Sequence, residues 1–217
     1  MVENKKVLID EQAQNQRYGY RFFKRMLDII ASVIGLIVLS PVFLIVSLAI
    51  KAEDRGPIFY SQVRLGKGQR PFKMYKFRSM VVDADKKLEK LLKQNEVEGA
   101  MFKMKEDPRI TRVGIFIRKH SLDELPQLLN VLTGDMSLVG PRPPLEREVA
   151  DYSEYDKQRL IVKPGCTGLW QVTARNDVDF GGMVKLDLNY IENSGILFDC
   201  VILLKTVAII FRPNSAY

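Results

Sequence analysis

The longest apolar run in the chain extends from Met26 to Ile50, and Asp28 is the only charged residue in it. As one straight helix the run would be about 37 Å long, which exceeds the roughly 30 Å hydrocarbon core of a bilayer. Ser40-Pro41 interrupts it near the middle, and a proline inside a helix removes a backbone hydrogen bond and clashes with the preceding turn. The sequence therefore predicts two helical limbs, neither of which is long enough to span a bilayer alone.

Three interpretations of this run compete. A cleaved signal peptide is disfavoured, although Ser47-Leu48-Ala49 offers a cleavage site, because the apolar stretch is too long and its leader too extended. A kinked spanning helix and a hairpin that enters and leaves by the same face remain open. Kinked spanning helices are the commoner structure in general, whereas basic residues at both ends place both ends in the cytoplasm and favour the hairpin. These residues are Arg21, Lys24 and Arg25 before the run, and Lys51, Arg55 and Arg64 after it.

The charge of the chain indicates anionic partners. Its 217 residues, enough for one domain with an appendage, carry a formal net charge of +7. The long apolar run fits a membrane surface, so no nucleic-acid partner is expected. Cys166 and Cys200 are far apart and His120 is the only histidine, which makes a zinc site a poor explanation. No P-loop, dinucleotide fingerprint or nucleophile elbow is present.

Beyond the apolar run, the patterns predict mostly helices and little β structure. Residues 57–65 and 71–80 alternate partly around Gly66 and Gly68, which predicts a β-hairpin or an extended loop. Loops are expected at 134–144 and 164–168, where glycines and prolines gather. Helices are expected at 82–99, near 121–132, and at 145–161, 181–193 and 196–211, the last of them apolar.

Asp123 and Glu124 are the sharpest candidates for chemistry. Ser121-x-x-Glu124 fits a capping box, and acidic residues near a helix start complement its dipole, which is a structural interpretation. Pro126 instead favours a later helix start, which leaves both acids at the mouth of the helix. In either case they lie near backbone N–H groups that suit phosphate. An Asp there can attack a phosphoryl group, and a neighbouring Glu can assist proton transfer or hold a divalent metal.

Arginines surround these acids in the sequence, and guanidinium groups pair bidentately with phosphate oxygens. Prolines fix the backbone on both sides of Arg142, as a phosphate clamp requires; the alternative is a connector with a solvated arginine. Asp83-Ala84-Asp85 resembles a metal-binding DxD pair, but it opens a charged segment and is better explained as a helix start. The arginines concerned are Arg109, Arg112, Arg118, Arg142 and Arg147.

Taken together, several stretches resemble the monotopic polyprenyl-phosphate phosphoglycosyl transferases, the bacterial sugar transferase family. The resemblance extends from about Phe22 to the end of the chain, and the order and spacing of the motifs are more specific than any one of them. A small departure is Thr173-Ala174, where members often have a glycine beside the arginine. The motifs are Lys24-Arg25-Met26-Leu27-Asp28, Ser40-Pro41, Tyr75-Lys76-Phe77-Arg78-Ser79-Met80, Asp107-Pro108-Arg109-Ile110-Thr111, the segment 121–127, Gly134-Asp135-Met136-Ser137, Val139-Gly140-Pro141-Arg142-Pro143, and Lys163-Pro164-Gly165 with Gly168, Gln171-Val172 and Arg175-Asn176.

The resemblance implies an α+β, mainly α fold, with a re-entrant membrane hairpin broken at Ser40 and Pro41 and a small cytoplasmic catalytic domain. Interfacial amphipathic helices and little β structure are expected in that domain. The implied divisions are a polar leader over 1–20, a membrane helix–break–helix over 21–51 and a catalytic domain over 52–217, which includes the apolar helix 196–211.

The resemblance also implies the reaction. Asp123 attacks the β-phosphate of a UDP-sugar, UMP leaves, and a polyprenyl phosphate then takes the sugar phosphate from the enzyme. Mg²⁺ is required, with Asp123 as its ligand, and Glu124 completes the dyad. The other implied residues are Arg118 and Arg142 near the phosphate, and Lys76, Arg78 and Arg175 in binding of the nucleotide sugar or polyprenyl phosphate.

A UDP-sugar, a polyprenyl phosphate and membrane lipid are thus the expected partners at the cytoplasmic face of a bacterial membrane. The expected role is the first membrane step of exopolysaccharide or capsule assembly. Two alternatives remain: a lipid-linked glycosyltransferase that releases UDP and uses Asp83 and Asp85, and a non-catalytic membrane adaptor. The sugar is open, with galactose and glucose as the leading candidates, and so is homo-oligomer formation.

Overall fold

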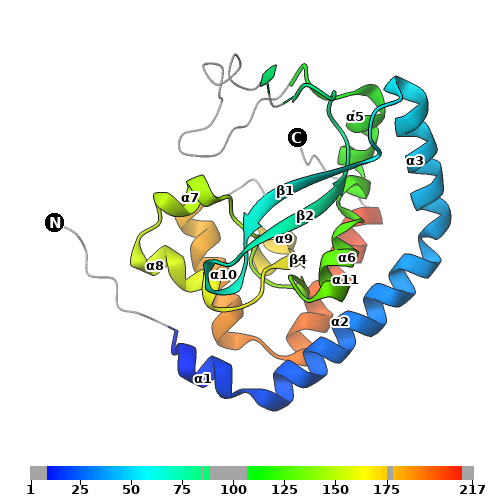
Figure 1. The fold of residues 1–217 in the computed structure, drawn as a ribbon. Coiled ribbons are helices and arrows are strands. Elements are labelled where there is room, and N and C mark those ends of the chain that lie inside the picture. Colours follow the sequence, from blue (N-terminus) through cyan, green and yellow to red (C-terminus); the bar gives the residue numbers. More distant parts are fainter. Residues whose placement is uncertain (1–8, 85, 88–106, 175–177, 212–217) are drawn as a thin grey trace.

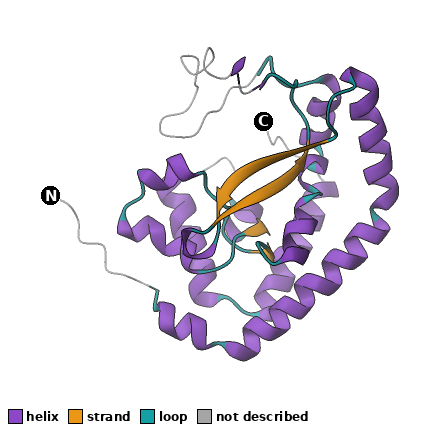
Figure 2. Ribbon diagram, viewed as in Figure 1, coloured by secondary structure: helices purple, strands orange, loops and turns teal. Residues whose placement is uncertain are grey.

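A computed structural model of the chain describes residues 9–84, 86–87, 107–174 and 178–211. Within these ranges the protein is mainly helical, and its strands form two small two-stranded sheets (Figure 2). The expectation of a mainly α structure with little β is therefore confirmed. Most of the helix predicted at 82–99 lies outside the described residues.

The apolar run forms two helices, α2 (Tyr18–Val38) and α3 (Ser40–Asp54), which make a long bent arc along one side of the molecule (Figure 1). The two are bent by 59° at the break. Pro41 has no N–H to donate to the Ile37 carbonyl oxygen, and the Ser40 hydroxyl donates to that oxygen instead, at 2.8 Å. The predicted break at Ser40-Pro41 is confirmed. Among the described helices, none is long and apolar enough to cross a membrane by itself, but this bent pair passes that test together.

The polarity of α2 is inverted relative to a helix on the surface of a water-soluble protein. Phe22 and Ile37 are about two-thirds exposed, whereas Asp28 is buried against the rest of the chain. The Asp28 carboxylate accepts hydrogen bonds from the Ser137 hydroxyl at 3.0 Å and from the Leu138 amide at 2.9 Å. A helix normally buries its apolar stripe and exposes its charges. The outer face of α2 therefore favours an apolar environment.

Strands β1 (Phe59–Leu65) and β2 (Pro71–Phe77) form the predicted antiparallel hairpin, joined by the 3₁₀ turn η1 (Lys67–Gln69). Gly68 supplies the left-handed conformation of the turn, with φ +63°. Tyr60 pairs with Lys76 in the register. Because side chains alternate along a strand, Tyr60, Gln62, Arg64 and Lys76 share one face of the hairpin.

The second sheet corrects the sequence prediction. Loops were expected at 134–144 and 164–168, but β3 (Ser137–Val139) and β4 (Gly165–Thr167) pair there in parallel. A Cβ atom on Gly165 would lie 2.1 Å from the Gly140 nitrogen, and one on Gly140 would lie 2.6 Å from the Lys163 carbonyl oxygen. These glycines therefore permit a close backbone approach between segments far apart in sequence.

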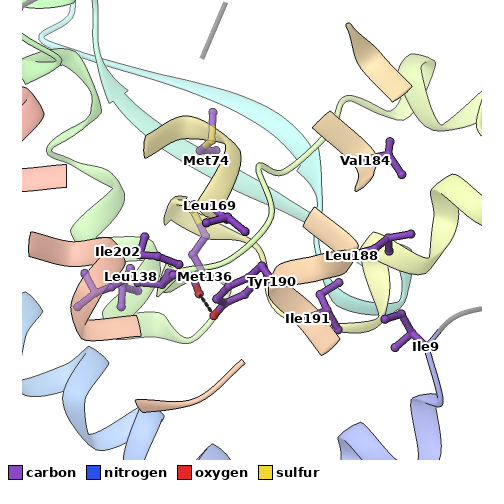
Figure 3. Packing of buried hydrophobic residues seen from close by; sticks show 12 residues of the cluster. Ile9, Met74, Met136, Leu138, Leu169, Val184, Leu188, Tyr190, Ile191 and Ile202 are labelled. Atoms are coloured by element: carbon purple, nitrogen blue, oxygen red, sulfur yellow. Dashed lines mark hydrogen bonds between the residues drawn. The ribbon is translucent and has the colours of Figure 1, made fainter. Parts of the chain in front are cut away.

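The main core lies where α6 (Gln127–Thr133) and β3 meet two C-terminal helices, α10 (Phe180–Asn193) and α11 (Ile196–Phe211), whose predicted extents are confirmed. Met136, Leu138, Leu188, Ile191 and Ile202 are buried together there (Figure 3). Burial of such side chains contributes roughly 1.5–3 kcal/mol each relative to exposure.

The sequence pattern predicts one helix over 145–161, but the structure does not have one helix there. The region divides into α7 (Glu146–Ala150), α8 (Glu154–Lys157) and the 3₁₀ turn η4 (Gln158–Ile161). Ser153 and Asp156 form a capping box, which starts a new helix inside the region. The remaining helices are α1 (Glu11–Gln16), α5 (Arg112–Lys119) and α9 (Leu169–Thr173).

Candidate active site

The two acidic residues lie in a short 3₁₀ turn, η3 (Leu122–Glu124), between α5 and α6. Ser121 adopts φ +54°, an uncommon conformation for a residue other than glycine, and reverses the chain just before them. Its side chain makes no capping bond, so the capping-box interpretation is wrong. The later helix start is confirmed, since Pro126 immediately precedes α6. Both acids therefore lie before the first turn of α6.

Lys76 from β2 joins the two carboxylates. Its Nζ lies 2.6 Å from Glu124 Oε1 and 3.7 Å from Asp123 Oδ2. Asp123 is buried, with 7% of its surface exposed, whereas Glu124 is half-buried. The site thus contains two adjacent carboxylates of different exposure that share one ammonium group.

The surroundings move the pKa values of the two acids in opposite directions. Burial raises the pKa of Asp123, and the charge of Glu124 adds to this, while Lys76 and Arg118 oppose it. Burial also disfavours the ionised form of Glu124, but Lys76 and then Arg142 outweigh that effect and lower its pKa. Two neighbouring acids whose pKa values diverge are typical of sites in which each has a separate role.

Two of the expected arginines flank the dyad. Arg118, half-buried at the end of α5, donates from Nε to the Ser79 hydroxyl at 3.0 Å. Arg142 is exposed between the buried Pro141 and Pro143. Each is close enough to influence the pKa of one carboxyl, Arg118 that of Asp123 and Arg142 that of Glu124. Both guanidinium groups are therefore placed to meet an anion at the dyad.

Arg78 has a different environment. Its guanidinium is buried and pairs with the Asp54 carboxylate, and it also donates to the Pro57 carbonyl oxygen at 2.5 Å and to that of Met80 at 3.1 Å. These bonds hold the end of α3 against the end of β2. The structure therefore places Arg78 beside the site as a link between elements. Arg175, the last of the basic positions, lies outside the described residues.

Two other sequence candidates are not brought to the dyad. Asp83 is exposed and pairs with Lys87 at 3.1 Å, one helical turn away, and Asp85 lies outside the described residues. The Nδ1 atom of His120 lies 2.8 Å from the Phe116 carbonyl oxygen, and the two rings are in contact, which is a structural role.

Arg64 is a site residue that sequence reasoning did not select. It was noted only as a basic residue after the apolar run, yet it is buried on the face of β1 that also carries Tyr60. Its charge influences the pKa of Glu124. The alternation of the strand around Gln62 was the available signal, because it places residues 60, 62 and 64 on one face.

Comparison with known proteins now identifies the family. The profile described as "Bacterial sugar transferase" matches residues 19–213. The chain belongs to the bacterial sugar transferase family. It is 48% identical over 201 residues to "Galactosyl transferase CpsE" of Streptococcus agalactiae, covering 92% of this chain and 44% of that protein. It is 46% identical to "Undecaprenyl-phosphate galactose phosphotransferase" of Salmonella typhimurium, covering 91% and 42%.

A relative of similar length is "Exopolysaccharide production protein ExoY" of Sinorhizobium fredii, 42% identical over 89% of this chain and 88% of that protein. The sugar transferase chain therefore spans less than half the length of the first two relatives and most of the length of this one.

The carboxylates of Asp123 and Glu124 in this bacterial sugar transferase are metal donors that fit Mg²⁺. Within the described ranges, no group of three or more His, Cys, Asp and Glu side chains could hold a metal ion. Mg²⁺ in phosphoryl-transfer sites is commonly bound by one or two carboxylates together with substrate phosphates. Asp123, with Glu124 beside it, supplies carboxylate oxygens of this kind next to arginines suited to phosphate.

Proposed function

We propose that this protein transfers a hexose 1-phosphate from a UDP-sugar to undecaprenyl phosphate and releases UMP. The name of the Salmonella relative, undecaprenyl-phosphate galactose phosphotransferase, supports the reaction class. The observation that carries the proposal is the buried Asp123 beside Glu124, with one lysine shared between them and arginines on both sides. Such a site suits phosphoryl transfer, which depends on positioning and on neutralising charge.

In the proposed first step, an Asp123 oxygen forms a bond to the β-phosphorus of the donor. The bond from that phosphorus to the bridging oxygen breaks, and UMP leaves with the electron pair. In the second step, an oxygen of undecaprenyl phosphate attacks the same phosphorus and displaces the carboxylate. The products are an undecaprenyl diphosphate sugar and free Asp123. One carboxylate thus serves both substrates in turn.

The environment of the dyad explains how Asp123 is prepared for attack. Its carboxyl must be ionised, and burial opposes that, because it raises the pKa. Lys76 and Arg118 act against burial and favour the carboxylate. Glu124 is the more acidic member of the pair and holds Lys76 at 2.6 Å, which keeps the ammonium group beside Asp123. Mg²⁺, held by Asp123 and substrate phosphates, would supply further charge neutralisation when bound.

The proposed membrane location rests on α2 and α3. The inverted polarity of α2 and the bend at Ser40-Pro41 support a re-entrant hairpin whose two ends face the cytoplasm, where UDP-sugars are found. To test this, single cysteines at Tyr18 and Lys51 would be introduced into a variant that lacks the native cysteines. In intact cells, an impermeant maleimide should label neither position. Labelling of one of them alone would show that the run crosses the membrane.

The reaction is tested with purified protein, Mg²⁺, a panel of UDP-sugars and undecaprenyl phosphate. The wild type should release UMP with one sugar, and Asp123→Asn should release none. Radiolabelled donor without acceptor should leave sugar phosphate on the protein in the wild type alone. Release of UDP would instead indicate a glycosyltransferase that passes the sugar without its phosphate. UMP release by both proteins would keep the reaction and reject Asp123 as the nucleophile.

A further inference from the structure

Arg64 is a buried cation whose charge acts on Glu124 of the dyad. Only 7% of its surface is exposed. Its Nε and one terminal nitrogen donate to Gln62 Oε1, at 3.1 and 2.7 Å, and the other terminal nitrogen donates to the Pro143 carbonyl oxygen at 3.1 Å. These acceptors satisfy its N–H groups in part, but all of them are neutral.

The other buried arginines of the described chain differ from Arg64 in one respect. Arg78 pairs with Asp54, Arg109 with Asp107 and Arg159 with Asp187. No described carboxylate lies within 4.0 Å of the Arg64 guanidinium. Removing an uncompensated charge from water is unfavourable. Arg64 is thus the described buried arginine that has no carboxylate partner, and it is close enough to the candidate active site to influence the pKa of Glu124.

A second cation, Arg142, lies close enough to Arg64 to influence its pKa. Burial and then the charge of Arg142 lower the pKa of Arg64 to about 10, although Glu148 and Glu124 act in the opposite direction. Arg142 directly precedes Pro143, whose carbonyl oxygen accepts a hydrogen bond from Arg64. The Leu65 amide donates to the Pro144 carbonyl oxygen at 3.0 Å. The end of β1 thus holds the loop that carries Arg142. Two cations that repel each other across this loop would both be stabilised by an anion.

We propose that Arg64 and Arg142 together form a phosphate-binding subsite beside the dyad, in which Arg64 contacts the phosphate directly. This inference rests on the proposed function, because both proposed substrates carry phosphate. The diphosphate of the donor and the phosphate of the lipid share the required chemistry. A structural alternative exists, in which Arg64 only positions Arg142 through Pro143.

A double-mutant cycle separates the two roles. The dissociation constant of UDP, and separately that of a short-chain isoprenyl phosphate, is measured by calorimetry for the full chain in detergent with Mg²⁺. The variants are Arg64→Gln, Arg142→Gln and the double variant, with Arg70→Gln, an exposed arginine of the same hairpin, as the matched control. Arg64→Gln should weaken binding roughly 10- to 100-fold, as expected for loss of a charged hydrogen-bond donor, and Arg70→Gln should not.

The decisive comparison is between the double variant and Arg142→Gln. Weaker binding by the double variant supports direct contact, and the ligand that is affected identifies the phosphate. Equal binding by the two shows that Arg64 acts only through Arg142 and overturns the proposal. If Arg64→Gln does not fold, Arg64→Lys is used in the same cycle, since it keeps the charge but loses the guanidinium fork.

The outcome is distinguishable from failure of the proposed function. If the wild type releases UMP but neither UDP nor the isoprenyl phosphate depends on Arg64 for binding, the subsite alone is rejected. UDP binding that depends on Arg64, without UMP release from any sugar, keeps the subsite and rejects the reaction.

Discussion

Replacing Asn130 with alanine should destabilise the protein and impair the dyad at the same time, because this side chain joins α6 to β2. Asn130 is fully buried. Its carboxamide oxygen accepts from the Tyr75 amide at 2.9 Å, and its carboxamide nitrogen donates to the Lys73 carbonyl oxygen at 2.7 Å. Lys76, the next residue of β2 after Tyr75, pairs with Glu124 at 2.6 Å. The alignment of the lysine with the dyad therefore depends on Asn130.

The magnitude follows from the two bonds that are lost. Alanine leaves one backbone N–H and one backbone C=O of β2 without their partner, and an unsatisfied buried group costs about 1–3 kcal/mol. We expect a loss of about 2–6 kcal/mol in the free energy of unfolding. For a chain of this size 1 kcal/mol corresponds to about 2–4 °C, so the Tm should fall on the order of 10 °C.

The assay combines thermal unfolding in detergent with single-turnover UMP release below the Tm of the variant. Asn130→Ala should also lower the rate of UMP release, on the order of 10-fold or more, because Lys76 is no longer held. Asn193→Ala is the control, since Asn193 is exposed and its carboxamide bonds only within α10. A Tm within about 1 °C of the wild type, with unchanged UMP release, would refute the argument that Asn130 couples α6 to β2.

Three further predictions concern charges. Lys76→Met should lower kcat roughly 100-fold and move the acid limb of the pH–rate profile to higher pH, because Lys76 lowers the pKa of both carboxyls. Asp123→Asn should abolish UMP release yet raise the Tm at pH 8, with the difference shrinking as the pH falls toward the ordinary pKa of an aspartate: burial raises the folded-state pKa of Asp123, so its ionisation costs stability as the pH rises through that folded-state pKa. Lys24→Met should cost about 3–5 kcal/mol, since it leaves the buried Asp199 without its ion pair, and adding Asp199→Asn should recover part of the loss in a denaturant titration.

Local patterns predicted the features that depend on neighbours in sequence. Pro41 carries its own reason for a helix break, so the bend could be expected from the chain alone. The hairpin follows from alternation around Gly66 and Gly68, and the later start of α6 follows from Pro126. The mainly α class follows from helical spacing over 181–193 and 196–211.

Features that depend on distant partners could not be predicted in this way. The strands β3 and β4 have three residues each, and their pairing depends on the contact between Gly140 and Gly165. Burial of Arg64 likewise depends on the loop at Pro143, which is 79 positions away. The lysine at 76 resembled a family position, but its contact with the dyad requires the fold that brings β2 to η3.

The bent helix pair is joined to the candidate site through both of its helices, which has a consequence for how the site meets a membrane. In α2, Asp28 binds the start of β3, and β3 leads directly into the loop that carries Arg142. At the end of α3, Glu53 accepts from the first two amides of α5, at 2.8 and 3.2 Å, and Asp54 pairs with Arg78 at the end of β2. The elements that supply Arg142, Arg118 and Lys76 are thus each attached to this pair. Because these attachments are buried or charged, a hairpin seated in a bilayer would hold the dyad at a fixed height above the lipid, where a lipid phosphate could reach it.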